Sequence, residues 1–218
     1  MTLAIFDLDN TLLNGDSDHA WGEFIADLGV VDAATYRQHN DAFYNDYCRG
    51  ELDIFAYQRF VLGVLVGKPL EELARWHAQF MREKIAGMIL PKAEALIAQH
   101  RAQGHTLMII TATNAFITTP IAARLGIDLL IATEPELRDG LYTGDITGTP
   151  CYREGKVERL NAWLQKNNRS LEGSFFYSDS HNDLPLLQKV DKPVAVDPDD
   201  KLKAFAEENG WLVMSLRK

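Results

Sequence analysis

The stretch LAIFDLDNT, from Leu3 to Thr11, begins as a short apolar run and then turns abruptly acidic. Such a run is typical of a strand buried on both faces of a parallel sheet. Asp7 and Asp9 follow it directly, and residues two apart in extended chain face the same side. Taken alone, the pair is equally compatible with a polar loop that caps a helix. Its position after a strand favours a functional site, because parallel sheets bind ligands beyond the carboxyl ends of their strands.

Short apolar runs recur along the chain, and helical periodicity fills most of the intervals between them. Buried strands are predicted at 3–6, 106–110, 129–132, 174–178, 193–196 and 211–214, and core helices at 92–103, 115–125, 155–166 and 199–208. Strands that alternate with helices imply a parallel sheet covered on both faces. The sequence therefore predicts an α/β fold with a Rossmann-like, doubly wound parallel sheet.

Residues 16–89 interrupt this alternation, because they contain helical pattern rich in aromatic residues and no convincing buried strand. Asp16 or Ser17, Asp32 and Asp53 each precede an apolar repeat and could cap a helix. We expect a catalytic core of residues 1–15 and 90–218 and an inserted, all-helical cap domain of residues 16–89. The turn-rich segment 137–150 is predicted to form a hairpin or flap on the core.

Composition narrows the class of protein. The chain has 218 residues, enough to bury an α/β core and a modest second domain. A net charge of −9 without a basic run argues against nucleic acid as a partner. No apolar stretch approaches the roughly 18 residues that a membrane span needs, and the N-terminus lacks the features of a signal peptide. We expect a cytoplasmic protein that binds neither nucleic acid nor membrane; the oligomeric state cannot be predicted.

Two other predicted strands also end in polar residues. Thr111 follows one strand, and the backbone N–H groups from Ala112 onward lead into a helix, so an anion could bind there. A simple helix cap is the alternative for Thr111. The other strand ends in Asp179-Ser180-His181-Asn182-Asp183, where Asp183 could equally cap the helix that follows. His181 could contact a phosphate or merely occupy a loop.

Lys156 lies at the start of a predicted helix, where the helix dipole disfavours a positive charge. Nearby anions would make that position tolerable. Acids at two strand ends, a hydroxyl at a third and a lysine together suit phosphoryl transfer, and carboxylate oxygens suit Mg²⁺.

These motifs resemble those of the haloacid dehalogenase-like superfamily of aspartate-nucleophile phosphatases, in particular its phosphoserine phosphatase-like branch. DLDNT resembles the first motif of the family, Thr111 the second, Lys156 the third, and Asp179 with Asp183 the fourth. The resemblance covers nearly the whole chain.

The resemblance implies a role for each of these residues. Asp7 would attack phosphorus to form an aspartyl-phosphate, and Asp9 would act as general acid and base. Thr111, Ala112 and Lys156 would hold phosphoryl oxygens. Mg²⁺ would be bound by the Asp7 side chain, the Asp9 backbone carbonyl and Asp179. Asp183, with Asn182 beside it, would support the metal site through water or orient Lys156.

The resemblance also implies a small phosphate ester as substrate, enclosed by the cap. In phosphoserine phosphatases an acid nine residues after the nucleophile recognises the substrate ammonium, and Asp16 has that position here. Arg59 falls where a cap arginine would recognise a carboxylate, although an exposed helix face is an equal alternative. DSHND departs from the glycine-rich fourth motif of those enzymes and resembles a sister group that includes histidinol-phosphate phosphatases. Asp18 and Glu23 lie close to Asp16 in sequence and make the entrance of the cap acidic, which suits a cationic amino-alcohol phosphate. The resemblance and this charge rank histidinol phosphate first and phosphoserine second.

Two other functions stay open from the sequence. A phosphotransferase or mutase would use the same aspartyl-phosphate with a different acceptor. A non-catalytic phosphate-binding relic would need no Asp9, and the presence of every expected acid argues against it.

Overall fold

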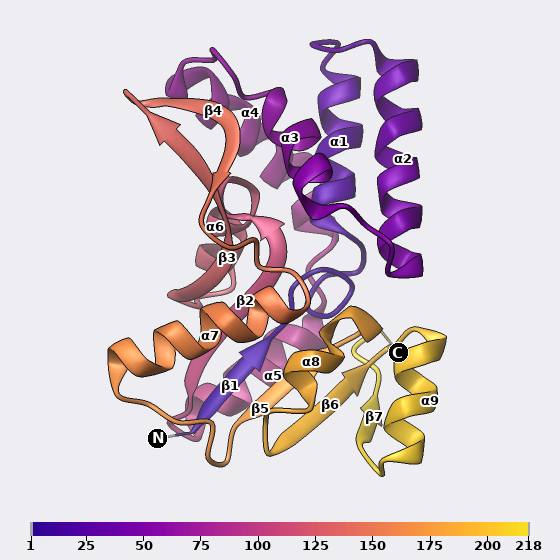
Figure 1. The fold of residues 1–218 in the computed structure, drawn as a ribbon, viewed down its shortest axis with the longest axis vertical. Coiled ribbons are helices and arrows are strands. Elements are labelled where there is room, and N and C mark those ends of the chain that lie inside the picture. The colour runs from indigo at the N-terminus through magenta and orange to yellow at the C-terminus, as the bar shows by residue number, and fades with distance from the viewer. Residues whose placement is uncertain (1, 218) are drawn as a thin grey trace.

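The computed structural model describes residues 2–217 and is built around a seven-stranded sheet (Figure 1). The strand order is β4-β3-β2-β1-β5-β6-β7, and all neighbouring strands are parallel except β3 and β4. The strands are β1 (Leu3–Phe6), β2 (Thr106–Asn114), β3 (Leu129–Arg138), β4 (Leu141–Thr147), β5 (Phe175–Ser178), β6 (Lys192–Val196) and β7 (Leu212–Met214). Because chain order runs outward from β1 in both directions, the predicted doubly wound α/β fold is confirmed.

Helices cover both faces of this sheet. Side chains alternate along a strand, so neighbouring residues of β1 enter opposite cores. Phe6 shares one core with Ile97, whereas Ile5 shares the other with Leu160. The core helices are α5 (Pro91–Ala102), α6 (Ala115–Arg124), α7 (Glu154–Asn167), α8 (Leu184–Leu187) and α9 (Asp200–Glu208), and a short 3-10 turn, η2 (His181–Asp183), precedes α8.

The chain between β1 and β2 folds as helices α1 (Ser17–Asp27), α2 (Ala33–Arg49), α3 (Ile54–Gly63) and α4 (Leu70–Glu83), followed by the 3-10 turn η1 (Ile85–Gly87). Asp16, Asp32 and Asp53 each accept a hydrogen bond from a backbone N–H in the first turn of a helix, so the sequence located the starts of α1 to α3 correctly. An isolated antiparallel bridge between Leu13 and Ile89 brings the two ends of the segment together. The segment therefore leaves the sheet and returns to it at one place.

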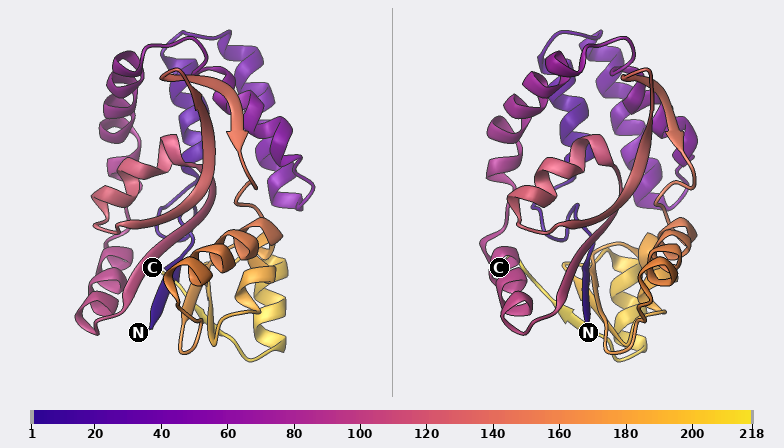
Figure 2. Two further views of the ribbon diagram at one scale, coloured as in Figure 1. Left: turned by 60° about the vertical axis from the view of Figure 1, so that its left-hand side comes forward. Right: turned by 90° about the vertical axis from the view of Figure 1, so that its left-hand side faces the viewer.

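The predicted hairpin is present, but it is longer than the sequence indicated. β3 continues to Arg138, turns at Asp139 and Gly140, both with positive φ, and pairs antiparallel with β4. The apolar run ends at Ala132 because the outer half of β3 is partly exposed and tolerates polar residues. Figure 2 shows this hairpin curving out of the sheet and rising beside the helices between β1 and β2, and β4 contacts α3.

No helix among residues 2–217 combines the length and apolarity needed to cross a membrane.

Gly155, which directly precedes Lys156, is tightly packed against the backbone of Pro150. A Cβ added at Gly155 would overlap the carbonyl oxygen of Pro150, whereas one at Gly63 in α3 would meet nothing within 4 Å. We expect Gly155→Ala to lower the free energy of unfolding by about 1–3 kcal/mol because the backbone must shift. Gly63→Ala should leave it unchanged or raise it by up to about 1 kcal/mol. Urea denaturation measures both, and equal stabilities would contradict the predicted overlap.

Candidate active site

Asp7 lies at the end of β1 with its carboxylate buried against a lysine. The Lys156 ammonium donates a hydrogen bond of 2.8 Å to Asp7 Oδ1 and forms an ion pair of 2.7 Å with Asp183. Lys156 comes from the first turn of α7 and is 2% exposed. The Asp7 N–H donates to the Tyr177 carbonyl at 2.9 Å, which fixes its backbone against β5. One buried lysine therefore joins acids from two strand ends.

Thr11 links Asp7 to the acid that follows β5. Its hydroxyl donates to Asp179 Oδ1 at 3.1 Å and lies 3.4 Å from Asp7 Oδ2, while the Asp179 N–H donates to the same hydroxyl at 3.1 Å. Asp183 accepts a further hydrogen bond of 2.7 Å from the Ser178 hydroxyl. The structure thus places Asp7, Asp179, Asp183 and Lys156 in one connected array.

Asp9 belongs to a separate set of contacts, with β2 and the start of α1. Its carboxylate accepts hydrogen bonds from the Ser17 N–H at 2.6 Å and the Thr113 hydroxyl at 2.8 Å. The Thr111 hydroxyl lies farther away, at 3.5 Å. The contact of Thr113 with Asp9 was not predicted, because the apolar run of this strand ends at Ile110 in the sequence. β2 runs to Asn114. Side chains two apart in a strand face the same side, and this alternation could have indicated that Thr113 lies on the same face as Thr111.

Burial and mutual repulsion raise the pKa of several of these acids. Burial is the main cause that raises the pKa of Asp7 to about 7, against the opposing effect of Lys156. Burial, with the carboxylate of Asp16, raises the pKa of Asp9 to about 6. Burial, Asp7 and Asp183 hold the pKa of Asp179 well above its usual range. For Lys156, burial acts to lower the pKa, but Asp183 and Asp7 outweigh it and the pKa is raised.

This excess of negative charge, together with hard oxygen donors, is what a magnesium site needs. The Asp7 and Asp179 carboxylates and the Asp9 backbone carbonyl could supply ligands. Elsewhere, ligand atoms of His19, Glu23 and Asp41 lie within 4.8 Å of one another. Glu23 is already paired with Arg37, and the Asp41 side chain is 63% exposed, so that group resembles an ordinary surface ion pair.

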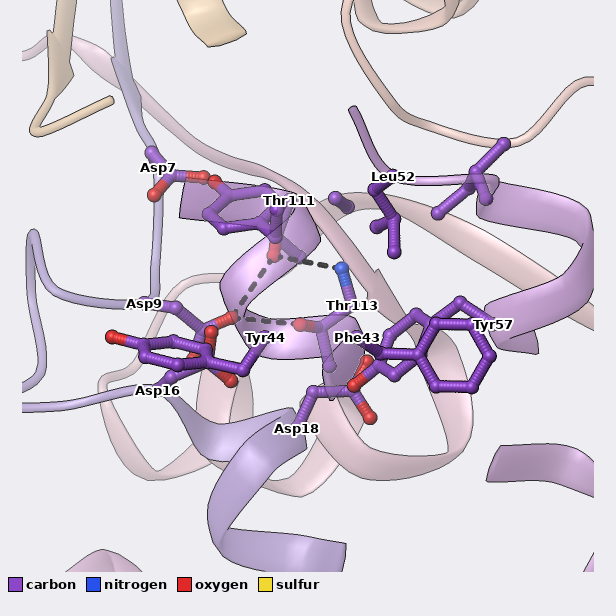
Figure 3. A pocket seen from close by; sticks show the side chains of 13 residues that line it. Asp7, Asp9, Asp16, Asp18, Phe43, Tyr44, Leu52, Tyr57, Thr111 and Thr113 are labelled. Atoms are coloured by element: carbon purple, nitrogen blue, oxygen red, sulfur yellow. Dashed lines mark hydrogen bonds between the residues drawn. The ribbon is translucent and has the colours of Figure 1, made fainter. Parts of the chain in front are cut away.

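A cavity lies beside Asp7 and extends toward the helices between β1 and β2 (Figure 3). Its walls consist of acidic, aromatic and aliphatic side chains, together with residues near the carboxyl end of β2. The lining residues are Asp7, Asp9, Asp16, Asp18, Phe43, Tyr44, Tyr47, Leu52, Ile54, Tyr57, Thr111, Ala112 and Thr113. None of these lining residues is a lysine or an arginine.

Asp16 and Arg59, the two residues predicted to select the substrate, lie in different places. Asp16 caps α1 and lines the cavity. Arg59 is exposed on α3 and is not part of the lining. Tyr57 occupies the cavity wall instead, and a residue two positions later points about 200° around the helix axis. The structure therefore does not bring Arg59 to the cavity.

Residues after β5 and around α7 and α9 also bind the C-terminal end of α2. Asn182 donates to the Tyr47 carbonyl at 3.0 Å, Arg153 to the Gly50 carbonyl at 3.2 Å, and Lys201 to the Arg49 carbonyl at 3.1 Å. We call these three hydrogen bonds the α2 clasp. His181 lies beside it, and its Nδ1 is 2.7 Å from Asp199 Oδ2.

Comparison with known proteins identifies the family. The model of the haloacid dehalogenase-like hydrolases matches residues 4–188. The chain is 47% identical over 219 residues to a histidinol-phosphatase of Neisseria meningitidis serogroup C (strain 8013), with 99% of each chain covered. The chain belongs to the haloacid dehalogenase-like hydrolase family, as its motifs predicted.

Solved structures agree with this assignment. A protein of unknown function from Bordetella pertussis Tohama I superposes with a TM-score of 0.93 at 45% identity, covering 99% of this chain and 100% of that one. A phospho-aspartyl intermediate analogue of phosphoserine phosphatase superposes with a TM-score of 0.71 at 19% identity, covering 100% and 94%, which shows a shared fold. The predicted enzyme class, a phosphatase, is confirmed together with the family.

The raised pKa of Asp9 predicts how stability depends on pH. The pKa rises from 3.8 to about 6 on folding, so the folded protein holds a proton that the unfolded chain releases. This stabilisation is complete below the unfolded pKa and is lost as the pH rises through the folded one. A shift of about two units is worth at most about 3 kcal/mol, and less here because Asp9 is only half-buried.

We therefore expect the Tm of metal-free protein to fall between about pH 4 and about pH 7, and to fall less in Asp9→Asn. Thermal denaturation in EDTA measures the difference. Asp145→Asn, which changes an exposed acid on β4, is the control and should keep the wild-type slope. Identical slopes for Asp9→Asn and wild type would contradict the prediction.

Proposed function

We propose that this phosphatase hydrolyses histidinol phosphate in a Mg²⁺-dependent reaction through an aspartyl-phosphate intermediate. The observation that carries the proposal is the buried Asp7–Lys156–Asp183 array beside a cavity whose lining contains four acids and no basic residue. The 47% identity with a histidinol-phosphatase over nearly the full length supports the choice of substrate.

Asp7 is the proposed nucleophile. Lys156 binds Asp7 Oδ1, which neutralises charge that would otherwise repel an incoming phosphate. A carboxylate oxygen of Asp7 attacks phosphorus, and the bond between phosphorus and the alcohol oxygen breaks. Water then attacks the aspartyl-phosphate and releases inorganic phosphate, which restores Asp7.

Asp9 is the proposed general acid and base. A pKa of about 6 leaves part of the Asp9 population protonated near neutral pH, as proton donation to the leaving alcohol requires. The resulting carboxylate can then take a proton from the attacking water. The Ser17 N–H and the Thr113 hydroxyl hold Asp9 in place for both steps.

Phosphoryl oxygens would be bound by three residues. Thr111 and Ala112 line the cavity at the end of β2, and Lys156 lies behind Asp7. Asp183 would position Lys156 through their 2.7 Å ion pair. Asn182 would support the same loop through its contact with Tyr47.

The donor set fits Mg²⁺, because the carboxylates of Asp7 and Asp179 have raised pKa values and both contact the Thr11 hydroxyl. Mg²⁺, when bound, supplies positive charge that favours ionised Asp7 and offsets the charge of the phosphate. The Asp9 backbone carbonyl would be a third protein ligand.

Residues 16–89 would act as the cap domain over a core formed by residues 1–15 and 90–218. Helices α1, α2 and α3 contribute most of the cavity wall opposite the sheet, including Asp18, Tyr44 and Tyr57. A cap in this position excludes water from the nucleophile until the substrate is bound.

The charge of the cavity distinguishes the two ranked substrates. Phosphoserine carries a carboxylate, and no lysine or arginine lines the cavity to receive it. Histidinol phosphate carries an ammonium and an imidazole ring but no carboxylate, so the acidic, aromatic walls suit it better.

The mechanism predicts the behaviour of two variants. Asp7→Asn should lower kcat by at least about a thousandfold because it removes the nucleophile, and Asp9→Asn by about a hundredfold to ten-thousandfold because it removes the acid and base. Phosphate release from histidinol phosphate and phosphoserine is measured with wild type, both variants and the control Asp145→Asn. Wild-type hydrolysis of phosphoserine in preference to histidinol phosphate would reject the proposed substrate.

The covalent step can be observed separately. Acid-quenched wild-type enzyme should carry phosphate on Asp7 by mass spectrometry, and Asp7→Asn should not. Inorganic phosphate released in equal amount to the alcohol identifies a hydrolase, whereas transfer to an added acceptor alcohol would identify a phosphotransferase.

Metal dependence gives a further prediction. EDTA should abolish turnover, and added Mg²⁺ should restore it. Asp179→Asn should need at least about tenfold more Mg²⁺ for half-maximal activity, because it weakens a proposed carboxylate ligand. Asp145→Asn should keep the wild-type requirement, and an unchanged requirement in Asp179→Asn would remove Asp179 from the ligand set.

A further inference from the structure

Asp18 is a buried acid that the mechanism above does not use. It lines the cavity, yet it is 3% exposed, and its Oδ1 has no hydrogen-bond partner. Leaving a buried carboxylate oxygen unpaired is costly, so an unpaired one in a cavity wall indicates a missing donor. The start of α1 does not need Asp18 as a cap, because Asp16 already accepts the hydrogen bond from the His19 N–H.

The surroundings of Asp18 define what that donor must look like. Figure 3 shows its carboxylate beside Phe43 and Tyr57, whose ring centroids are 5.3 Å apart, whereas Asp16 lies next to Asp9 and Tyr44. Burial, followed by the charges of Asp16 and Asp9, raises the pKa of Asp18 well above its usual range, and the nearby hydroxyls of Tyr57 and Thr113 offset this in part. This part of the cavity therefore combines aromatic walls with an acceptor that lacks a donor.

A flat ring with an N–H at its edge satisfies both features. The ring packs against aromatic side chains, and the N–H donates to the carboxyl group. Imidazole has an ordinary pKa of about 6.5, so the proton shared between a carboxyl group and an imidazole can lie on either of the two groups. An ammonium on a short aliphatic chain would also donate to Asp18 and contact an aromatic face, but it buries less apolar surface against Phe43 and Tyr57 than a flat ring does.

We propose that Asp18 determines specificity by binding the imidazole ring of the substrate beside Phe43 and Tyr57. The inference rests on the proposed function, and it gives Asp18 a task distinct from the recognition of the ammonium that the family resemblance implies for Asp16. It also accounts for a buried carboxylate oxygen, Asp18 Oδ1, that has no hydrogen-bond partner among the residues that the structure describes.

A comparison of two substrates isolates the contribution of the ring N–H from the contributions of the ammonium, the phosphate and the aromatic ring. Phenylalaninol phosphate keeps the ammonium, the phosphate and an aromatic ring, but its ring has no N–H. We expect wild-type enzyme to favour histidinol phosphate by about tenfold or more in kcat/KM, since one hydrogen bond to a charged group is at stake. In Asp18→Ala the ratio should fall close to one, and in Asp18→Asn it should fall only in part, because the amide oxygen still accepts a hydrogen bond; Asp145→Asn keeps the wild-type ratio. Because the readout is a ratio for a single preparation, partial loss of folded enzyme does not affect it.

Three outcomes would overturn the inference. One is an unchanged ratio in both Asp18 variants, and another is a wild-type enzyme that does not distinguish the two substrates. The third is hydrolysis of p-nitrophenyl phosphate with neither amino-alcohol ester accepted, which would reject the proposed substrate as well but leave the phosphatase chemistry intact.

Discussion

The buried ion pairs of Lys156 with Asp7 and Asp183 are the constraint on which the site depends. They join the end of β1, the loop after β5 and the first turn of α7, three places far apart in sequence. Removing one partner of a buried pair leaves an uncompensated charge and typically costs about 3–5 kcal/mol. The close approach of Gly155 to Pro150 sets the backbone that delivers the lysine. The position of the proposed nucleophile is thus fixed by electrostatics as well as by strand pairing.

The same array is electrostatically incomplete without a ligand. Asp7 and Asp183 share one lysine, while Asp179 is bound to Thr11 beside them. Burial, together with the neighbouring acids, raises the pKa of both Asp7 and Asp179. Asp9 and Asp18 add further acids along the cavity. Active sites commonly retain such unfavourable groups because ligands compensate them. The cationic ligands proposed for the two ends of the cavity, a metal ion and an imidazole, would balance this charge.

Much of this arrangement could be predicted from the sequence because parallel strands end at one edge of a sheet. That rule placed Asp7, Asp179 and Asp183 together, and an electrostatically misplaced lysine pointed to Lys156. The same reasoning noted Asp18 at the start of the cap and Thr113 after a predicted strand, but it gave neither residue a contact, because their surroundings depend on where α1 and β2 lie in the folded protein. Arg59 lies away from the cavity because helix register, which sequence alone constrains weakly, points Tyr57 inward instead.

The α2 clasp has a mechanical consequence. Its donors Asn182, Arg153 and Lys201 hold backbone carbonyls, so substitutions of side chains on α2 cannot delete the acceptors. Asn182 is also the neighbour of Asp183, whose carboxylate holds Lys156. Any swing of α2 away from the sheet must break these hydrogen bonds and pull on the loop that carries Asp179 and Asp183. If the cavity opens by movement of α2, the opening would therefore disturb the loop that positions the proposed catalytic lysine.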